Sequence, residues 1–103
     1  MSETQGVRIS VEVKGSPISG GAQVSSTFAA NWPVEWRQLD AVVASIDRVT
    51  SPDGAMIGRH NHVFLTSGNH SKFIRGEVTL IDAVLGDGQT LIVEVSVMGY
   101  GDS

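Results

Sequence analysis

The chain contains no cysteine among its 103 residues. This absence excludes a disulfide framework, thiolate zinc ligands and a cysteine nucleophile. Cations are also scarce, because only seven Lys and Arg residues stand against eleven Asp and Glu, and the formal net charge is −4. The cations are scattered singly, so a phosphate backbone would meet no basic stripe. The sequence therefore predicts no nucleic-acid partner.

Long apolar runs are missing as well, and none approaches the roughly 20 residues that a membrane-spanning helix requires. The first ten residues, MSETQGVRIS, lack the basic region and apolar stretch of a secretory signal. From these two absences we expect no membrane partner and a cytoplasmic location. The phosphate-binding patterns GxGxxG and GxxxxGK[ST] and the nucleophile pattern GxSxG do not occur. Their absence argues against the familiar nucleotide-binding loops and serine hydrolases.

What remains is typical of one globular domain covering residues 1–103. Hydrophobic residues make up 41% and charged residues 17%, which is enough to bury a core in a chain of this size. Residues 1–5 are expected to form a disordered tail. From Val7 to Lys14 apolar and polar residues alternate strictly, which predicts a half-buried strand. A weaker alternation over 22–28 predicts a second strand.

Residues 31–54 predict a single helix at about 33–50. Pro33 suits the first helical turn, Glu35 would complement the helix dipole, and the SPDG segment at 51–54 would end the helix. On a helical wheel the apolar residues fall on one broad face: Trp32, Trp36, Leu39, Val42, Val43, Ile46 and Val49. We therefore expect this amphipathic helix to pack on a sheet.

The C-terminal third predicts a β-hairpin at about 72–100. Asp87-Gly88 favours a type I′ turn, and the register that it sets pairs Leu80 with Val95 and Val78 with Val97. The expected fold class is α+β, with the element order β-β-α-β-β-β. It is an antiparallel sheet packed on one amphipathic helix.

The second face of that hairpin carries four apolar residues among polar ones: Phe73, Ile81, Ile92 and Met98. A single helix, about 27 Å long, covers one face of a sheet and leaves the other open. We expect the open face to form a homodimer interface. The alternative is that isolated apolar residues on a sheet surface have no such role.

Three histidines lie within eleven positions, at His60, His62 and His70. His60 and His62 would share one face of a strand and could together bind a transition metal. A tight turn at 66–69 would place His70 on the opposite face, and no acidic residue lies between them to complete a site. The sequence therefore favours ordinary exposed or half-buried histidines over a metal centre, and it predicts no other cofactor.

Two carboxylates are expected on apolar faces, Glu35 on the helix and Asp82 on the hairpin. Buried together, they would form an acid–base pair. The alternatives are that Glu35 caps the first turn and that Asp82 sits at a bulge or a strand end. Trp32 and Trp36, four residues apart, are favoured as core residues. Otherwise they form the floor of a pocket for a small apolar ligand beside Glu35.

The leading hypothesis is a small, non-enzymatic binding or interaction domain. It would be homodimeric through the exposed sheet face, and a small apolar ligand could lie between helix and sheet. Two alternatives remain open. One is a small hydrolase or isomerase that uses Glu35 and Asp82 as acid and base, and the other is a metal-binding protein that uses the three histidines.

Overall fold

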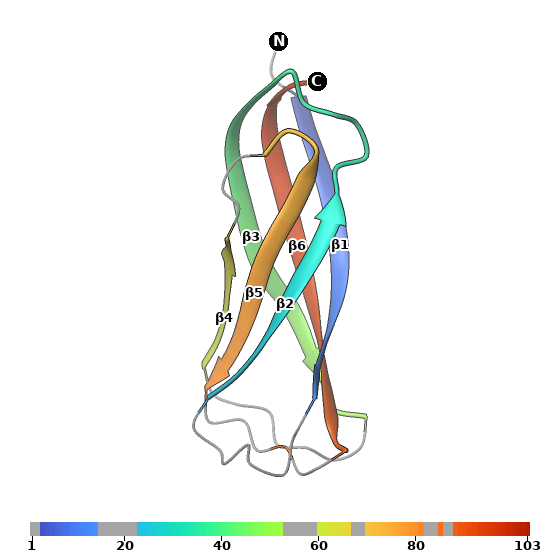
Figure 1. Cartoon of the computed structure of the whole chain (residues 1–103), viewed down its shortest axis with the longest axis vertical. Helices are drawn as coiled ribbons and strands as arrows, with labels where there is room; N and C mark the ends of the chain where they lie inside the picture. The colour runs from blue at the N-terminus through green and yellow to red at the C-terminus, as the bar shows by residue number, and fades with distance from the viewer. Residues whose placement is uncertain (1–2, 15–22, 53–59, 67–69, 82–84, 86–87) are drawn as a thin grey trace.

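The computed structural model describes residues 3–14, 23–52, 60–66, 70–81, 85 and 88–103. They form six strands: β1 (Glu3–Lys14), β2 (Gln23–Asn31), β3 (Gln38–Thr50), β4 (His60–Leu65), β5 (Phe73–Ile81) and β6 (Thr90–Asp102). The strands make two antiparallel sheets of three strands, ordered β1-β6-β3 and β2-β5-β4 (Figure 1). The sheets lie face to face in an elongated sandwich of 48 × 19 × 19 Å. None of the described residues belongs to a helix that is long and apolar enough to span a membrane.

The core lies between the two sheets and is built from the inward-facing residue of each alternating pair. On β1, Val11 and Val13 are buried while Glu12 and Lys14 between and beside them are exposed. The predicted alternation of this strand is therefore confirmed. The strand begins at Glu3, which pairs with Gly101 of β6, so most of the expected tail over residues 1–5 is part of the sheet.

The expected α+β class is wrong, because the described part of the chain is all-β and contains no helix. Most of the segment expected to be helical, about 33–50, forms β3. Its register shifts between Leu39 and Ala41 and again between Ile46 and Arg48, and each shift is a β-bulge. A bulge inserts one extra residue and turns the following side chains to the other face of the strand. The partly buried residues of β3 that pack against the core are Leu39, Val42, Ala44, Ile46 and Val49.

Spacings of three residues at the two bulges explain the false helical signal. The residues at 39, 42, 46 and 49 recur every three or four positions, as they would on one face of a helix. In the strand, Ala44 completes the inward set and restores a spacing of two between the bulges. The segment also contains β-branched residues such as Val42, Val43 and Ile46, which favour strands.

The expected C-terminal hairpin is also wrong. β5 and β6 are both strands, but they belong to different sheets and do not pair. Leu80 lies opposite Val24 and Asn61, whereas Val95 lies opposite Ile9 and Ile46. The apolar residues of the two strands face each other across the core instead of side by side in one sheet. Gly88 has a positive φ of 81°, which suits a turn, but the chain crosses there from one sheet to the other.

One end of the sandwich is closed by the segment between β2 and β3. Trp32 and Trp36 are buried there, edge to face, with ring centroids 5.6 Å apart. Both rings lie against Gly99 of β6, where an added Cβ would come within 2.7 Å of Trp32 and 2.9 Å of Trp36. The backbone N–H of each Trp donates a 3.0 Å hydrogen bond, Trp32 to the Lys72 carbonyl and Trp36 to the Ser71 carbonyl. These bonds connect the closing segment to the chain just before β5.

Candidate functional site

Of the expected acid–base pair, the structure describes Glu35, which is not buried. Glu35 lies in the closing segment with its side chain 60% exposed, and its carboxylate is 4.0 Å from the Lys72 ammonium. Asp82 lies outside the described residues. The expected ligand pocket between helix and sheet has no counterpart in the described part of the chain, which has no helix there. Trp32 and Trp36 are packed in the core, as the favoured expectation had it, and not at the floor of such a pocket.

The histidines lie at two separate places on one sheet. His62 is opposite Thr79 near the end of β5, and His60 is opposite Ile81, while the side chain of His60 lies outside the described part. His70 stacks on Phe73 at the start of β5. Phe73 and Thr79 are six residues apart, about 20 Å along a strand, so His62 and His70 are too far apart to bind one metal ion. The described residues contain no group of three or more His, Asp or Glu that could hold a metal.

The four expected interface residues lie on two opposite surfaces, because β5 and β6 belong to different sheets. Ile92 and Met98 point outward from the sheet β1-β6-β3, whose outer surface is named the β6 face. Phe73 and Ile81 point outward from the sheet β2-β5-β4, whose outer surface is named the β5 face. A single interface with one partner surface cannot contain all four residues.

The β6 face carries a contiguous apolar patch at the end where the termini lie. Met98 pairs with Val43 on one side and with Gly6 on the other, and Tyr100 pairs with Ala41 in the next outward row. Val43 is 57% exposed, Tyr100 40% and Met98 37%. We call these four residues, Ala41, Val43, Met98 and Tyr100, the Met98 patch. The Met98 side chain covers Gly6, where an added Cβ would lie 3.0 Å from its sulfur.

Charged residues of both signs occupy the middle of the β6 face. The Arg48 guanidinium donates two 3.2 Å hydrogen bonds to the two carboxylate oxygens of Glu94. These hydrogen bonds, and then the charge of Glu94, raise the pKa of Arg48. Asp47 accepts a hydrogen bond from the Ser96 hydroxyl. A hollow next to the Met98 patch is lined by Arg8 together with Asp47, Arg48 and Glu94.

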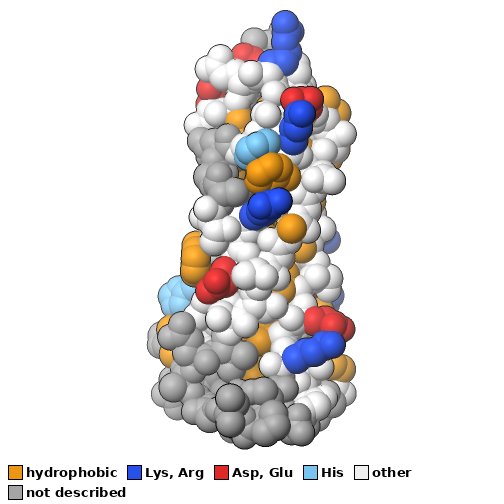
Figure 2. All heavy atoms as spheres, viewed as in Figure 1, with side chains coloured by type: hydrophobic (Ala, Val, Ile, Leu, Met, Phe, Trp, Pro, Cys, Tyr) orange, Lys and Arg blue, Asp and Glu red, His pale blue; other side chains and the backbone are white. Residues whose placement is uncertain are grey.

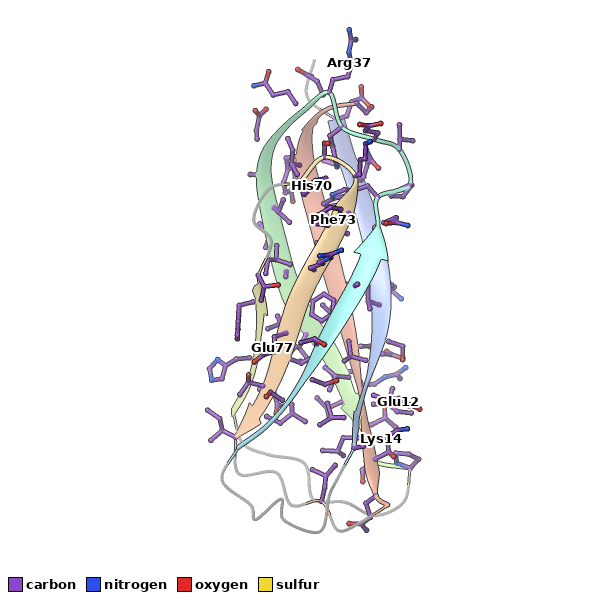
Figure 3. All side chains as sticks on the ribbon, viewed as in Figure 1. Glu12, Lys14, Arg37, His70, Phe73 and Glu77 are labelled. Atoms are coloured by element: carbon purple, nitrogen blue, oxygen red, sulfur yellow. The ribbon has the colours of Figure 1, made fainter. Side chains whose placement is uncertain are left out.

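The β5 face carries a stack of three side chains at the start of β5. The His70 imidazole lies on the Phe73 ring with centroids 3.6 Å apart and planes at 20°. The Arg75 guanidinium carbon is 4.5 Å from the centroid of the same ring. Figure 2 shows the histidine, hydrophobic and cationic side chains following one another down this face, and Figure 3 shows His70 and Phe73 at the upper end of β5 with Glu77 further along it.

A groove on the β5 face begins beside Arg75. It is lined by Thr27, Phe28, Ala29, Thr66, Arg75 and Gly76. Gly76 has no side chain, and the Phe28 ring takes the position that one would occupy, since an added Cβ would be 2.4 Å from Cζ. On the same face Phe64 is 48% exposed and lies opposite Glu77. The groove therefore combines one cation and two hydroxyls with an apolar floor.

Compared with known proteins, the chain matches no family model, no curated protein and no solved structure. Of the residues that compose the two faces, the sequence indicated Met98 and Phe73 as exposed apolar positions. It did not indicate Val43 as a neighbour of Met98, because the helical interpretation of β3 placed the two residues on different elements. Tyr100 lies two residues from Met98 on the same strand and face, a spacing that the sequence itself contains.

Proposed function

We propose that the protein is a small interaction domain that forms a homodimer through its β6 face. The observation that supports this most directly is the Met98 patch, in which Val43, Met98 and Tyr100 are exposed and adjacent. Contiguous exposed apolar side chains on a soluble domain mark sites of association, because removing them from water is favourable. Isolated apolar residues on a surface would carry no such meaning.

A second copy of the chain suits this face because the face is complementary to itself. In a twofold dimer with its axis along the strands, the Met98 patch of one copy lies over the Met98 patch of the other. The same rotation places β1 of one copy over β3 of the other. Arg8 on β1 then approaches Asp47, which β3 carries at its second bulge. The charges beside the patch therefore favour, rather than oppose, the contact.

The size of the face limits the affinity. β6 has 13 residues, which gives a face about 43 Å long and, for three strands, about 14 Å wide, or roughly 600 Å². Standard stable interfaces bury about 800 Å² on each partner. A dimer that uses the whole β6 face therefore lies at the lower end of the size range. We expect a dissociation constant of micromolar order.

The test replaces Met98 with glutamate. Two carboxylates would meet on the twofold axis, and we expect the dissociation constant to rise at least about 30-fold, since interface anchors contribute about 2 kcal/mol or more. Sedimentation velocity over a range of protein concentrations measures the change. The matched control is Phe64→Glu, which places the same charge at an exposed aromatic residue of the opposite face.

Both variants should unfold at nearly the temperature of the wild type once all three proteins are monomeric, because both sites are exposed. The control should associate like the wild type. A wild-type protein that stays monomeric at every concentration would refute the dimer. Equal loss of association in both variants would show that the β6 face is not the interface.

A further inference from the structure

The stack on the β5 face is held in place from the core outward. The indole N–H of buried Trp32 donates a 3.1 Å hydrogen bond to the His70 carbonyl. The backbone N–H of Lys72 donates a 3.1 Å hydrogen bond to Nδ1 of His70. The first bond holds the backbone of His70 against the core, and the second holds its imidazole ring. Because Phe73 packs on that imidazole, its ring is also held in a defined position.

Phe73 lies between His70 and Arg75. An imidazole at 3.6 Å leaves no space for a guanidinium on the same side of the ring, so Arg75 occupies the opposite side. A guanidinium that lies over an aromatic face is attracted to that face, and its N–H groups stay available to hydrogen-bond acceptors. A fixed guanidinium loses less conformational freedom when it binds a carboxylate than a free one does.

Arg75 forms no ion pair with an acidic side chain in the described part of the chain. The described part of the chain contains ion pairs of Lys14 with Glu12, Arg48 with Glu94 and Lys72 with Glu35, and Arg75 is in none of these. The nearest acid on its own strand and face is Glu77, two residues on, about 7 Å away along the strand. The chain as a whole has a net charge of −4. Arg75 is nevertheless a fixed, exposed cation that suits a carboxylate ligand.

The groove beside Arg75 leads toward β2, the edge strand of this sheet. In the described residues β2 is hydrogen-bonded to one strand only, β5. From Gln23 to Asn31 it contains neither a charge nor a proline, the two features with which edge strands usually block further pairing. Ala29 of β2 lies beside Arg75 in the same cross-strand row. Its small side chain leaves the guanidinium accessible from the β2 edge.

The other edges differ from β2 in this respect. β3 has two bulges and carries charges at Asp47 and Arg48, and β1 carries Arg8, Glu12 and Lys14. β4 is only six residues long. The edge of β2 is therefore the one most suited to accept a further strand among those described.

We propose that the β5 face binds an extended acidic peptide, which pairs with the free edge of β2 and places a Glu or Asp side chain against Arg75. Main-chain hydrogen bonds to β2 supply the affinity, as in other cases of strand addition. The carboxylate accepts two parallel hydrogen bonds from the guanidinium, which supplies the specificity. Thr27 and Thr66 also line the groove. Thr66 lies opposite Arg75, to whose carbonyl its backbone N–H donates a hydrogen bond, and Thr27 lies in the next outward row, opposite Glu77. This site lies on the face opposite the proposed dimer interface, so the two proposals are independent.

The probe is the blocked pentapeptide acetyl-Thr-Val-Glu-Val-Thr-amide, compared with the same peptide carrying Gln in place of Glu. It is titrated into isotope-labelled Met98→Glu protein, which keeps dimerisation out of the measurement, and backbone and arginine side-chain NMR shifts are recorded. We expect saturable shifts at Ala29, Thr66 and the Arg75 Nε–H. Binding should be at least about tenfold weaker for the Gln peptide, because a charge-assisted pair is lost.

Protein variants test the role of the guanidinium. Arg75→Gln should weaken binding of the Glu peptide to the level of the Gln peptide, and Arg75→Lys should show an intermediate loss, because it keeps the charge without the planar fork. Unchanged shifts elsewhere verify that each variant is folded. Arg75→Lys alone suffices if Arg75→Gln does not fold.

Three outcomes would overturn the proposal. The first is equal binding of the Glu and Gln peptides, and the second is the lack of saturable shifts on β2 and β5. The third is that sodium acetate alone reproduces the shifts with the same affinity, which would make Arg75 a site for small anions only. If wild-type protein binds the peptide while Met98→Glu does not, the two faces are coupled and the assumed independence is wrong.

Discussion

Replacing Trp36 with alanine is expected to lower the free energy of unfolding by about 3–5 kcal/mol, the usual cost of removing a large buried aromatic side chain. Trp36 is 2% exposed, and its ring closes one end of the sandwich between Gly99 and Trp32. Because the rest of the closing segment is tied by hydrogen bonds to Ser71 and Lys72, it cannot easily collapse into the space that the indole leaves. Urea unfolding monitored by circular dichroism measures the change.

Two further variants make this measurement specific. Trp36→Phe keeps an aromatic ring and removes an indole N–H that has no hydrogen-bond partner in the described part of the chain. It should cost clearly less than Trp36→Ala, since an unpaired buried donor is itself destabilising. Val34→Ala, two residues away and 56% exposed, should change stability by less than about 0.5 kcal/mol. A Trp36→Ala protein as stable as the Val34→Ala protein would show that this end of the sandwich is not a packed core.

Local alternation in the sequence predicts strands well where one face of the strand is buried and no bulge interrupts it. β1 is such a strand, because Val7, Ile9, Val11 and Val13 alternate with polar residues along a regular pairing with β6. β5 and β6 were predicted as strands for the same reason. β3 was not, because its two bulges change the spacing of the inward residues from two to three. A bulge depends on the neighbouring strand, and no pattern within β3 itself identifies it.

The pairing of strands is not determined by the same local pattern. Val78 and Leu80 on β5, like Val95 and Val97 on β6, need only to reach a common core. They can do so side by side in one sheet or face to face across two sheets, and both arrangements satisfy the alternation. The wrong choice placed Phe73 and Met98 on one surface, although they lie on opposite sides of the molecule. It also hid the row of Val43, Met98 and Gly6 that crosses the β6 face at the Met98 patch.

Arg75 could not have been recognised as a binding residue from the sequence, because its environment comes from three separate segments. His70 precedes the strand, Trp32 fixes His70 from the closing segment, and Ala29 lies beside Arg75 on β2. The only local signal is the spacing of Phe73 and Arg75, which puts both on one face of a strand. That spacing becomes informative once β5 is known to be the central strand of a sheet.

The substitution Gly101→Ala tests the first bulge of β3 and is expected to cost about 3 kcal/mol in the free energy of unfolding, at the upper end for overpacking in a well-packed site. An added Cβ would lie only 2.1 Å from the Gln38 carbonyl oxygen and 3.0 Å from the Leu39 Cα. Both obstacles are backbone atoms, so no side-chain rotation relieves the clash. The backbone is held there, since the Arg37 N–H donates a 2.7 Å hydrogen bond to the Asp102 carbonyl.

Gly6→Ala is the matched control for Gly101→Ala. Gly6 lies on β1 opposite Met98 of β6, and its added Cβ would meet the Met98 sulfur at 3.0 Å. That obstacle is the end of a flexible side chain, which can turn away, so the cost should be below about 1 kcal/mol and partly offset by the lower chain entropy of alanine when unfolded. If both alanine variants prove equally stable, β3 does not approach Gly101 through a bulge. The inward positions of β3, and the explanation of its helix-like spacing, would then be wrong. A large difference between them would instead establish that a glycine on β6 is what permits the bulge.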